Sequence, residues 1–291
     1  TPSDYVSAVR AGYESHGNDG TAQPRTKLVS SEPPGMCTGY LAILPEVGAM
    51  GGYTYAAGFG DRDAHFALPL FDAESGALLA LLDGASMNPF KTGATGAVGV
   101  DELAREDARI CAVIGSSAQA RGQLKATATV RDFEAVRVFS STAGHRRTFA
   151  SEFDDRLSAD VRAVGSAADA VADADVVITA TTATDPVLRN ADLPEGVHIT
   201  AMGQYDRGKR ELDAATVARA TYVPDLRERA FQDAGSFLAA REAGVVDDDH
   251  VHAELGEVVA GHSPGRTSSD EVTVFDSGGT GIETVAAAWM L

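Results

Sequence analysis

The strongest constraint on the fold is a short apolar run that ends at a glycine and passes at once into a helix-forming segment. Residues 110–114, Ile-Cys-Ala-Val-Ile, have the length and composition of a buried strand. Gly115 follows, and the residues from Ala118 to Val130 favour a helix. A strand that turns this tightly into a helix directs unpaired N–H groups and the positive end of the helix dipole at the space above the turn. The segment therefore predicts an anion-binding site.

The spacing of small residues at this turn is similar to the G-x-G-x-x-G/A pattern of dinucleotide-binding folds. The stretch Gly115-Ser-Ser-Ala-Gln-Ala120 keeps the first and last positions, but Ser117 stands where the second glycine is usual. An ordinary strand-to-helix turn is the alternative, so the assignment depends on the surrounding sequence. The predicted pyrophosphate contacts are Gly115, Ser116, Ser117, Ala118 and Gln119.

Beyond residue 109 short apolar segments alternate with helical ones. Strands are predicted at 110–114, 136–139, 161–164, 176–179, 197–201 and 221–223, and helices at 118–130, 144–153, 167–172 and 213–219. This alternation specifies a parallel sheet covered on both faces. The glycine turn ends its first strand, where a doubly wound fold binds its ligand. We therefore predict an α/β fold with a Rossmann doubly wound parallel sheet.

The first hundred residues have a different pattern. They predict an amphipathic helix over 3–16 that is capped by Ser3, and then an antiparallel sheet. A helix that starts at Pro89 is rich in glycine, which indicates close packing against a neighbour. The strands expected in this sheet are 40–44, 53–57, 65–71 and 77–82, with turns at Gly60-Asp61 and 73–76. Residues 271–291 predict a strand, a glycine loop and a closing helix.

The charge balance excludes some partners. The 291 residues include 42 acidic and 24 basic side chains, for a formal net charge of −18. Such a surface repels nucleic acid and anionic membranes, and it suits a salty cytoplasm in which charges are screened. An ordinary acidic protein is the alternative. No apolar run approaches the roughly 20 residues of a membrane span, and the first residues lack a signal-peptide pattern. Cys37 and Cys111 are expected to be buried, and we expect a cytoplasmic location.

The segment after the second predicted strand indicates which dinucleotide is bound. In NAD-binding folds an acidic residue about 20 positions past the glycines contacts the ribose hydroxyls. This chain has hydroxyls and arginines there instead, in Ser140-Ser-Thr142 and Gly144-His-Arg-Arg147. The pattern favours NADP(H) over NAD(H); the alternative is that Arg146 and Arg147 are solvated charges. The predicted contacts are Ser140, Ser141, Thr142 and Arg146.

Several segments together resemble the ornithine cyclodeaminase/μ-crystallin family, which includes alanine dehydrogenases and ketimine reductases. The matching stretches, in family order, are Lys91-Thr-Gly-Ala94, 115–120, Thr181-Thr182, Asp185-Pro-Val187, 208–213, 255–261, Pro264-Gly-Arg266 and 273–278. The resemblance implies a dimer formed through N-terminal sheets. It implies an α+β substrate and dimerisation domain, residues 1–107 with 271–291, and a dinucleotide-binding Rossmann domain, residues 108–270. It also implies a strand before residue 1 and a longer C-terminal helix.

When the family's functional residues are matched to this sequence one by one, some positions keep the expected charge and others do not. Arg25 matches a basic residue that helps to hold the substrate, and Lys91 matches an arginine that binds the substrate carboxylate. Tyr53 stands in place of a family lysine. Tyr205 stands in place of the aspartate that ornithine cyclodeaminases use, although Asp206 is the next residue. We therefore predict Lys91, Tyr205 and Asp206 as catalytic and Arg25, Tyr53 and Lys91 as substrate-binding. Further cofactor contacts are predicted at Thr181, Thr182, Met202, Ser277 and Gly278.

Three functions follow from these residues. The first is an NADP(H)-dependent oxidoreductase, with NAD possible, that transfers hydride to or from a small amino or imino acid. Ornithine cyclodeaminase chemistry, which gives proline and ammonia with recycled NAD, is an alternative that a carboxylate such as Asp206 would support. A nucleotide-binding protein without turnover is the other, because Tyr53 and Tyr205 depart from the family and are as well explained by packing. His250 and His252 are expected in a solvated turn, and no metal site is expected.

Overall fold

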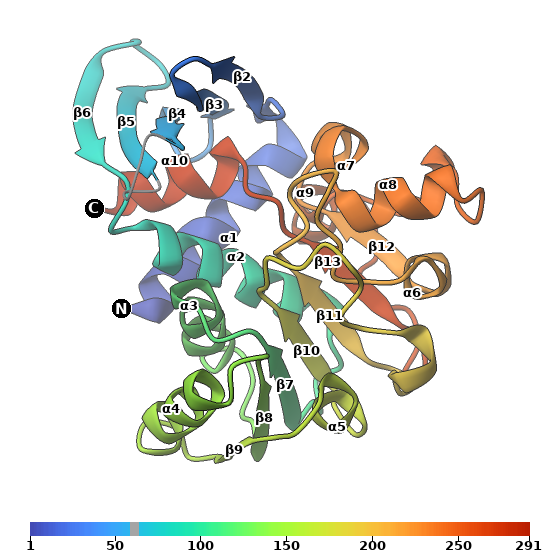
Figure 1. Cartoon of the computed structure of the whole chain (residues 1–291). Helices are drawn as coiled ribbons and strands as arrows, with labels where there is room; N and C mark the ends of the chain where they lie inside the picture. Colours follow the sequence, from blue (N-terminus) through green and yellow to red (C-terminus); the bar gives the residue numbers. More distant parts are fainter. Residues whose placement is uncertain (59–63) are drawn as a thin grey trace.

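The computed structural model describes residues 1–58 and 64–291, and over these it contains an antiparallel sheet and a parallel sheet (Figure 1). Helices α1 (Pro2–Asn18), α2 (Asn88–Leu103) and α10 (Gly281–Met290) lie between the two sheets (Figure 1). The predicted turn at Gly60-Asp61 falls outside the described residues. Two sheets joined by a shared layer of helices place their facing edges next to one another, and the candidate site lies there.

The antiparallel sheet has the order β1-β3-β4-β5-β6, with β2 paired to β3. Its alternate residues face the helices: Thr38 and Tyr40 of β3 are buried, whereas Cys37, which precedes Thr38, is exposed. The expectation that Cys37 is buried is therefore wrong, because it points away from the helical layer; Cys111 is buried as expected. The strands are β1 (Thr21–Ala22), β2 (Thr26–Ser31), β3 (Pro34–Leu44), β4 (Ala49–Ala57), β5 (Ala64–Asp72) and β6 (Leu78–Asp83).

Two local predictions for this part need correction. Helix α1 is capped by Thr1 and not by Ser3: the Thr1 hydroxyl accepts a hydrogen bond from the Asp4 N–H, at 3.3 Å, while Asp4 folds back onto Thr1. Strands β1 and β2 were not predicted. Strand β2 is exposed along its whole length, so its sequence lacks the alternation that marks a half-buried strand. The turn at 73–76 is confirmed, with the Asp72 carbonyl accepting from the Gly76 N–H at 3.0 Å.

Helix α2 packs closely against α3 (Ala118–Thr127), as its glycines predict. A Cβ atom on Gly93 would lie 2.3 Å from the carbonyl oxygen of Gly122, and one on Gly122 would lie 2.2 Å from that of Pro89. Both distances are impossible contacts, so the two backbones approach at a separation that only glycine permits. This contact fixes the first helix of the parallel part against the helical layer.

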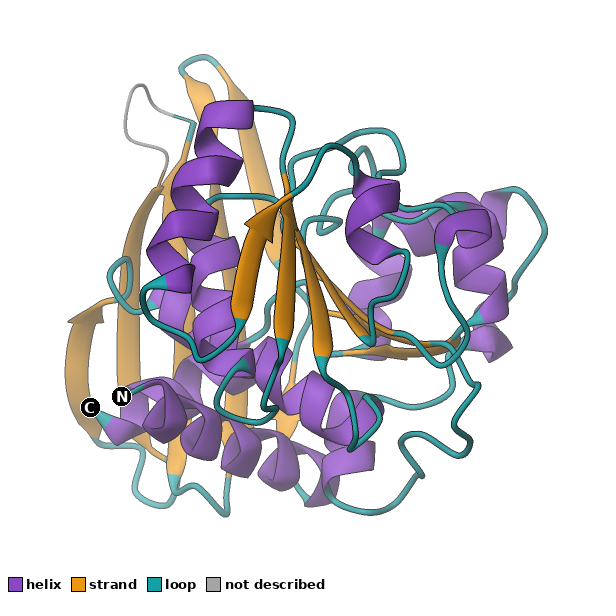
Figure 2. Cartoon of the chain, turned by 90° about the horizontal axis from the view of Figure 1, so that it is seen from below, coloured by secondary structure: helices purple, strands orange, loops and turns teal. Residues whose placement is uncertain are grey.

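The parallel sheet has the order β12-β13-β11-β10-β7-β8-β9, and helices cover it on both faces (Figure 2). The predicted doubly wound α/β fold is confirmed, and most element bounds differ by only a few residues. Its strands are β7 (Ile110–Ile114), β8 (Ala135–Phe139), β9 (Asp160–Ala163), β10 (Val176–Thr179), β11 (His198–Ala201), β12 (Thr221–Pro224) and β13 (Thr273–Asp276). The remaining helices are α4 (Ala143–Asp154), α5 (Ala167–Val171), α6 (Ala214–Arg219), α7 (Arg227–Asp233), α8 (Gly235–Glu242) and α9 (Leu255–Val259), with 3₁₀ turns at Asn190–Asp192 and Asp248–His250.

Strand β13 changes the expected division of the chain. The sequence grouped residues 271–291 with the N-terminal part, but β13 pairs with β11 and β12 inside the parallel sheet. Only α10, which follows it, packs on the antiparallel sheet (Figure 1). The loop of residues 277–280 between β13 and α10 therefore crosses from one part of the molecule to the other.

Candidate functional site

The glycine turn lies where the strand order reverses. Chain order runs outward from β7 through β8 and β9, then returns to β10 on the other side of β7. Gly115 follows β7 with φ +129°, and a Cβ atom there would lie 2.4 Å from the carbonyl oxygen of Ala180, which follows β10. Glycine is thus required on both conformational and steric grounds. A crevice between diverging strands at this point is where doubly wound sheets bind ligands.

Ser117, which replaces the second glycine of the pattern, caps helix α3. Its hydroxyl accepts a hydrogen bond from the Ala120 N–H at 3.3 Å. A capping hydroxyl stabilises the start of the helix and holds its first turn in place beneath the crevice. The substitution therefore keeps the helix N-terminus as an anion-binding element, with Ser116, Ala118 and Gln119 around it.

The predicted ribose segment lies at the end of β8. Arg146 of α4 folds back so that its Nη1 atom donates to the Ser140 carbonyl at 2.8 Å, and its guanidinium lies 5.5 Å from the centre of the Phe139 ring. The Ser140 hydroxyl donates to the Thr142 carbonyl at 3.3 Å, and Ser141 and Thr142 are exposed. Arg146 is thus ordered at the strand end, whereas Arg147 is exposed.

Glu211 joins the loops that follow β10 and β11. Its carboxylate accepts hydrogen bonds from the Thr179 hydroxyl at 2.7 Å and from the N–H groups of Thr181 at 2.7 Å and Gly203 at 2.6 Å. Burial raises the pKa of Glu211, and these donors oppose the rise. Met202 is held beside Gly203, its sulfur accepting from Gln123 at 3.6 Å. Sequence reasoning did not single out Glu211; its place in the matched 208–213 stretch was the one signal for it.

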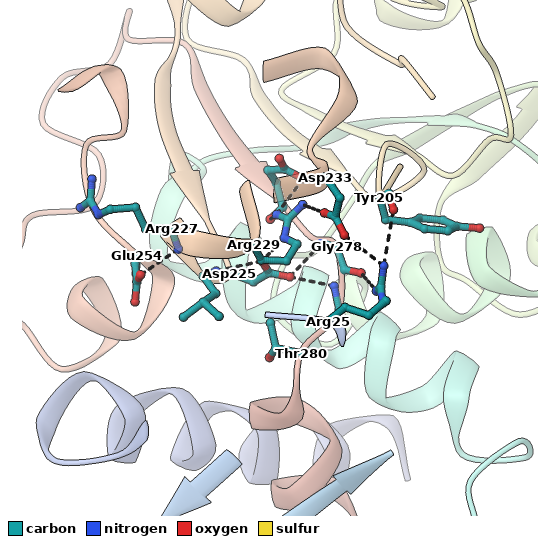
Figure 3. A network of polar contacts seen from close by, with 12 residues as sticks. Arg25, Tyr205, Asp225, Arg227, Arg229, Asp233, Glu254, Gly278 and Thr280 are labelled. Carbon is teal, nitrogen blue, oxygen red and sulfur yellow. Dashed lines mark hydrogen bonds and ion pairs between the residues drawn. The ribbon is translucent and has the colours of Figure 1, made fainter. Parts of the chain in front are cut away.

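A buried ionic cluster holds the loop between β13 and α10 (Figure 3). Arg229 has no exposed surface, and its guanidinium lies 2.9 Å from Asp225, 3.1 Å from Asp276 and 3.3 Å from Asp233. The second carboxylate oxygen of Asp225 accepts from the N–H groups of Gly278 at 2.7 Å and Gly279 at 2.8 Å. Burial raises the pKa of Asp225, and Arg229 acts against that rise. Arg229 thereby fixes the backbone at Gly278.

The sequence indicated none of this cluster, although one signal was present. Asp225 directly follows the strand segment that ends with Val223-Pro224, and Arg229 comes four residues later, which is the spacing of side-chain pairs on a helix. Ser277, predicted as a cofactor contact, lies next to the cluster, and its hydroxyl is buried without a hydrogen-bond partner. An unpaired buried hydroxyl at the end of a parallel strand is a group that a bound ligand can satisfy.

Arg25 lies at a cavity of about 500 Å³ between the two parts of the molecule. Its Nη2 atom donates to the Gly278 carbonyl at 2.8 Å, and Nη1 lies 3.3 Å from Asp233 (Figure 3). Its Nε atom is buried and has no partner. The cavity is lined by Arg25, Lys27, Met36, Tyr55, Tyr205, Asp206, Arg207, Lys209, Gln232 and Asp233. The structure therefore brings together Arg25, Tyr205 and Asp206 of the predicted site.

Tyr205 and Asp206 differ in their surroundings. The Tyr205 hydroxyl accepts a hydrogen bond from the Lys209 ammonium at 2.8 Å, which leaves its own proton free for a ligand. Asp206 lies 3.6 Å from Lys27 and accepts from the Gly208 N–H at 3.0 Å. This N–H and the nearby Lys27 lower the pKa of Asp206, so its carboxylate is ionised at neutral pH and has no proton to donate.

Lys91 and Tyr53 do not line this cavity. The Lys91 ammonium is buried, 3.0 Å from the carboxylate of Glu283 on α10, and 5.2 Å from the centre of the Tyr53 ring. Tyr53 is also fully buried and donates to the Gly84 carbonyl at 2.8 Å. The Lys91 ammonium therefore forms an internal ion pair with Glu283 and does not face the cavity, although this position was expected to bind a substrate carboxylate.

The histidine-containing segment of residues 247–252 binds its own neighbours. His250 Nε2 lies 2.7 Å from the Val217 carbonyl, and His252 Nε2 lies 3.0 Å from that of Pro264. Over residues 1–58 and 64–291, no three metal-ligating side chains converge. Within the same residues no helix has the length and apolarity that a membrane crossing needs.

The parallel sheet, with a glycine turn at its switch point, defines a dinucleotide-binding Rossmann protein. The ornithine cyclodeaminase/mu-crystallin family model matches residues 38–291. A putative dehydrogenase of Rhizobium meliloti is 37% identical over 220 residues, which are 75% of this chain and 67% of that protein. The chain belongs to the ornithine cyclodeaminase/mu-crystallin family, as its motifs predict.

Two solved structures resemble the whole chain. One is the Δ1-pyrroline-2-carboxylate reductase of Thermococcus litoralis in complex with NADH and L-proline, with a TM-score of 0.92, 31% identity and coverage of 100% of this chain and 92% of that one. The other is an archaeal alanine dehydrogenase dimer with bound NAD. Its TM-score is 0.91 and its identity is 30%, and the match covers 100% of this chain and 90% of that one.

Proposed function

We propose that the protein is an NAD(P)-dependent oxidoreductase that transfers hydride to or from a small amino or imino acid. The observation that carries this proposal is the position of the Arg25 cavity. Tyr205 and Gly278 follow β11 and β13, so they lie at the same edge of the parallel sheet as Gly115, which follows β7. A carboxylate-binding cation and a dinucleotide turn at one edge are what a dehydrogenase of amino acids needs.

The residues present fit a nicotinamide dinucleotide. The capped N-terminus of α3 favours the charge of a pyrophosphate at the turn after Gly115, and the guanidinium of Arg121, which donates to the Ser116 carbonyl, adds a cation beside this turn. The unpaired Ser277 hydroxyl and the loops fixed by Glu211 would hold the nicotinamide end, with Thr181, Thr182, Met202 and Gly278. When bound, the nicotinamide ring supplies the hydride or accepts it.

We further propose NADP(H) as the preferred cofactor, with NAD(H) possible. Ser140, Ser141, Thr142 and Arg146 supply hydroxyls and a cation at the end of β8, where an NAD-binding fold has a carboxylate. The ordered position of Arg146 supports this choice. Comparing KM for NADPH and NADH tests it; a strong preference for NADH would contradict it.

The chain's own residues have two tasks in this reaction. Arg25 orients the substrate through its carboxylate, and Gly278 and Asp233 hold the guanidinium in place. Reduction of an imine carbon leaves electron density on nitrogen, which takes a proton; Tyr205 donates it, and the Lys209 ammonium stabilises the phenolate that remains. Lys91 is not part of this proposal because Glu283 already neutralises it.

A single-turnover experiment distinguishes this function from the alternatives. The protein is mixed with reduced or oxidised cofactor and a panel of amino, imino and oxo acids, and nicotinamide absorbance and ammonia are followed. A net absorbance change supports the oxidoreductase. Ammonia without net change means a cyclodeaminase, for which Asp206 lines the same cavity. Cofactor binding without either signal over a broad panel means a binding protein.

We also propose a homodimer formed through the outer face of the antiparallel sheet. That face carries exposed apolar side chains, opposite the residues that pack on the helical layer. They are Leu28, Leu41, Ile43, Leu79 and Leu81. An apolar patch of this kind needs a partner, and a second copy of the chain is the occupant we propose. Light scattering should give a dimer mass, and Leu81→Glu should give a monomer. Separately, we propose that the protein is cytoplasmic.

A further inference from the structure

The cavity at Arg25 has a charge opposite to that of the protein. The chain carries 42 acidic and 24 basic residues, yet the ten residues that line the cavity include four basic and two acidic ones. Lysine is rare in this chain, where Lys27, Lys91, Lys125 and Lys209 are the lysines, and two of them line this cavity. Cations gathered at one place on an otherwise negative protein indicate an anionic ligand.

The cations come from both sides of the cavity. Arg25 and Lys27 lie at the start of β2, and Arg207 and Lys209 lie in the loop after β11. Arg25 is nine-tenths buried and keeps an unpartnered Nε donor, whereas Lys27 is 42% exposed. A ligand in the cavity therefore meets a buried guanidinium on one side and a second pair of cations on the other.

The two carboxylates at the cavity are already matched by cations. Asp233 is shared between Arg25 and the buried Arg229. Asp206 pairs with Lys27 and accepts from the Gly208 N–H. Over residues 1–58 and 64–291 neither Arg207 nor Lys209 forms a direct ion pair with a carboxylate; the Lys209 ammonium donates to the Tyr205 hydroxyl, and its charge adds to that of Lys27 in lowering the pKa of Asp206. The cavity thus keeps an excess of positive charge after its own ion pairs are formed.

We propose that the substrate carries two anionic groups: the α-carboxylate, bound at Arg25, and a second carboxylate, which faces Arg207 and Lys209. The substrate class is a dicarboxylic amino acid and its imine, which deepens the proposed function and rests on it. A monocarboxylate leaves the second pair of cations unmatched. A diamino acid such as ornithine brings a distal ammonium towards like charges, which is unfavourable.

The first test is equilibrium binding, because it does not need turnover. Calorimetry with the protein saturated by oxidised cofactor compares 2-oxoglutarate with 2-oxopentanoate, which has the same chain length and one carboxylate. We expect the dicarboxylate to bind about tenfold more tightly or better, and the difference to shrink as salt screens the charges. Equal affinity for the two oxo acids would overturn the inference whether or not the protein is an enzyme.

The second test assigns the preference to the cavity. Arg207→Gln removes a lining cation, and Arg210→Gln removes an exposed arginine of the same loop that does not line the cavity. We expect Arg207→Gln to weaken 2-oxoglutarate several-fold while leaving 2-oxopentanoate and the cofactor unchanged, and Arg210→Gln to change none of them. Equal effects of the two variants would show that general surface charge sets the preference, and the inference would fail.

Activity measurements separate this inference from the function on which it rests. Reductive amination of 2-oxoglutarate or oxaloacetate should exceed that of 2-oxopentanoate or 2-oxobutyrate in kcat/KM. Turnover of monocarboxylates or ornithine with equal efficiency would sink the dicarboxylate assignment and leave the oxidoreductase standing. Selective binding of dicarboxylates without turnover would support the dicarboxylate assignment and overturn the proposed oxidoreductase activity.

Discussion

Replacing Lys91 with methionine tests whether this residue holds the fold or the substrate. Its ammonium and the Glu283 carboxylate are buried and lie 3.0 Å apart. Glu283 also accepts from the Thr280 N–H at 2.8 Å and from the Thr280 hydroxyl at 2.6 Å, so it caps α10. In Lys91→Met the carboxylate stays in the core without its cation, which is the costly way to break a buried pair.

The expected loss is large enough to measure. Removing one partner of a buried ion pair costs about 3–5 kcal/mol. The unfolding entropy of a 291-residue chain is about 0.6 kcal/mol per kelvin, so Tm should fall by about 5–8 °C. Calorimetry at pH 8 measures the shift. The double variant Lys91→Met/Glu283→Gln should recover most of it, because no charge is then left unpaired and the glutamine can still accept from the Thr280 N–H.

Activity decides between the structural and the substrate role. If Lys91 acts through Glu283, the double variant keeps the wild-type substrate KM. A Tm unchanged in Lys91→Met, together with a raised substrate KM in both variants, would refute the reasoning and assign Lys91 to the substrate carboxylate, as the family resemblance implies. Lys125→Met, which removes a lysine of α3 outside any described ion pair, is the control for general charge effects.

Three further outcomes are expected. Gly115→Ala should abolish cofactor binding in fluorescence titrations, because its Cβ would lie 2.4 Å from the Ala180 carbonyl oxygen; retained binding would contradict the turn assignment. Arg146→Gln should raise KM for NADPH about tenfold or more and leave KM for NADH unchanged, with Arg147→Gln as the exposed control. Burial lowers the pKa of His198 well below its ordinary value, so below about pH 6.5 the unfolded chain binds a proton that the folded one does not. The free energy of unfolding therefore decreases as the pH is lowered below that value, by at most about 1.4 kcal/mol per pH unit. Urea midpoints between pH 5 and 8 should show a weaker pH dependence in His198→Gln, and an unchanged one would count against this cause.

The parallel sheet was predictable because its signals are local. Its central strands are short apolar runs, and β7 and β10 were predicted to the residue. The run of small residues also located α2 and its close contacts, since glycines inside a helix favour a close approach of two backbones. Strand β2 was not predicted, because every residue in it is exposed and a strand without a buried face has no alternation of apolar and polar residues.

Strand β13 and the buried ionic cluster depend on contacts between distant parts of the chain. The sequence predicts a strand near residue 273 but not its insertion between β11 and β12, which is decided by tertiary pairing. Arg229 meets Asp225 at helical spacing, but its bond to Asp276 joins positions 47 apart. A buried arginine is tolerated where carboxylates and carbonyls satisfy its donors, and no local pattern specifies that arrangement.

The candidate site shows how such distant contacts can change a residue's role within a family. The resemblance implies cations at the positions of Lys91 and Tyr53, and the chain keeps one of them in sequence. In the fold Glu283, 192 positions away, neutralises Lys91, and Tyr53 contributes no charge. Positive charge at the cavity therefore comes from Arg25 and from residues of β2 and of the loop after β11. Because a substrate is selected by the charges that face it and not by those buried behind them, this relocation of cations is where we expect the specificity of the chain to depart from that of its relatives.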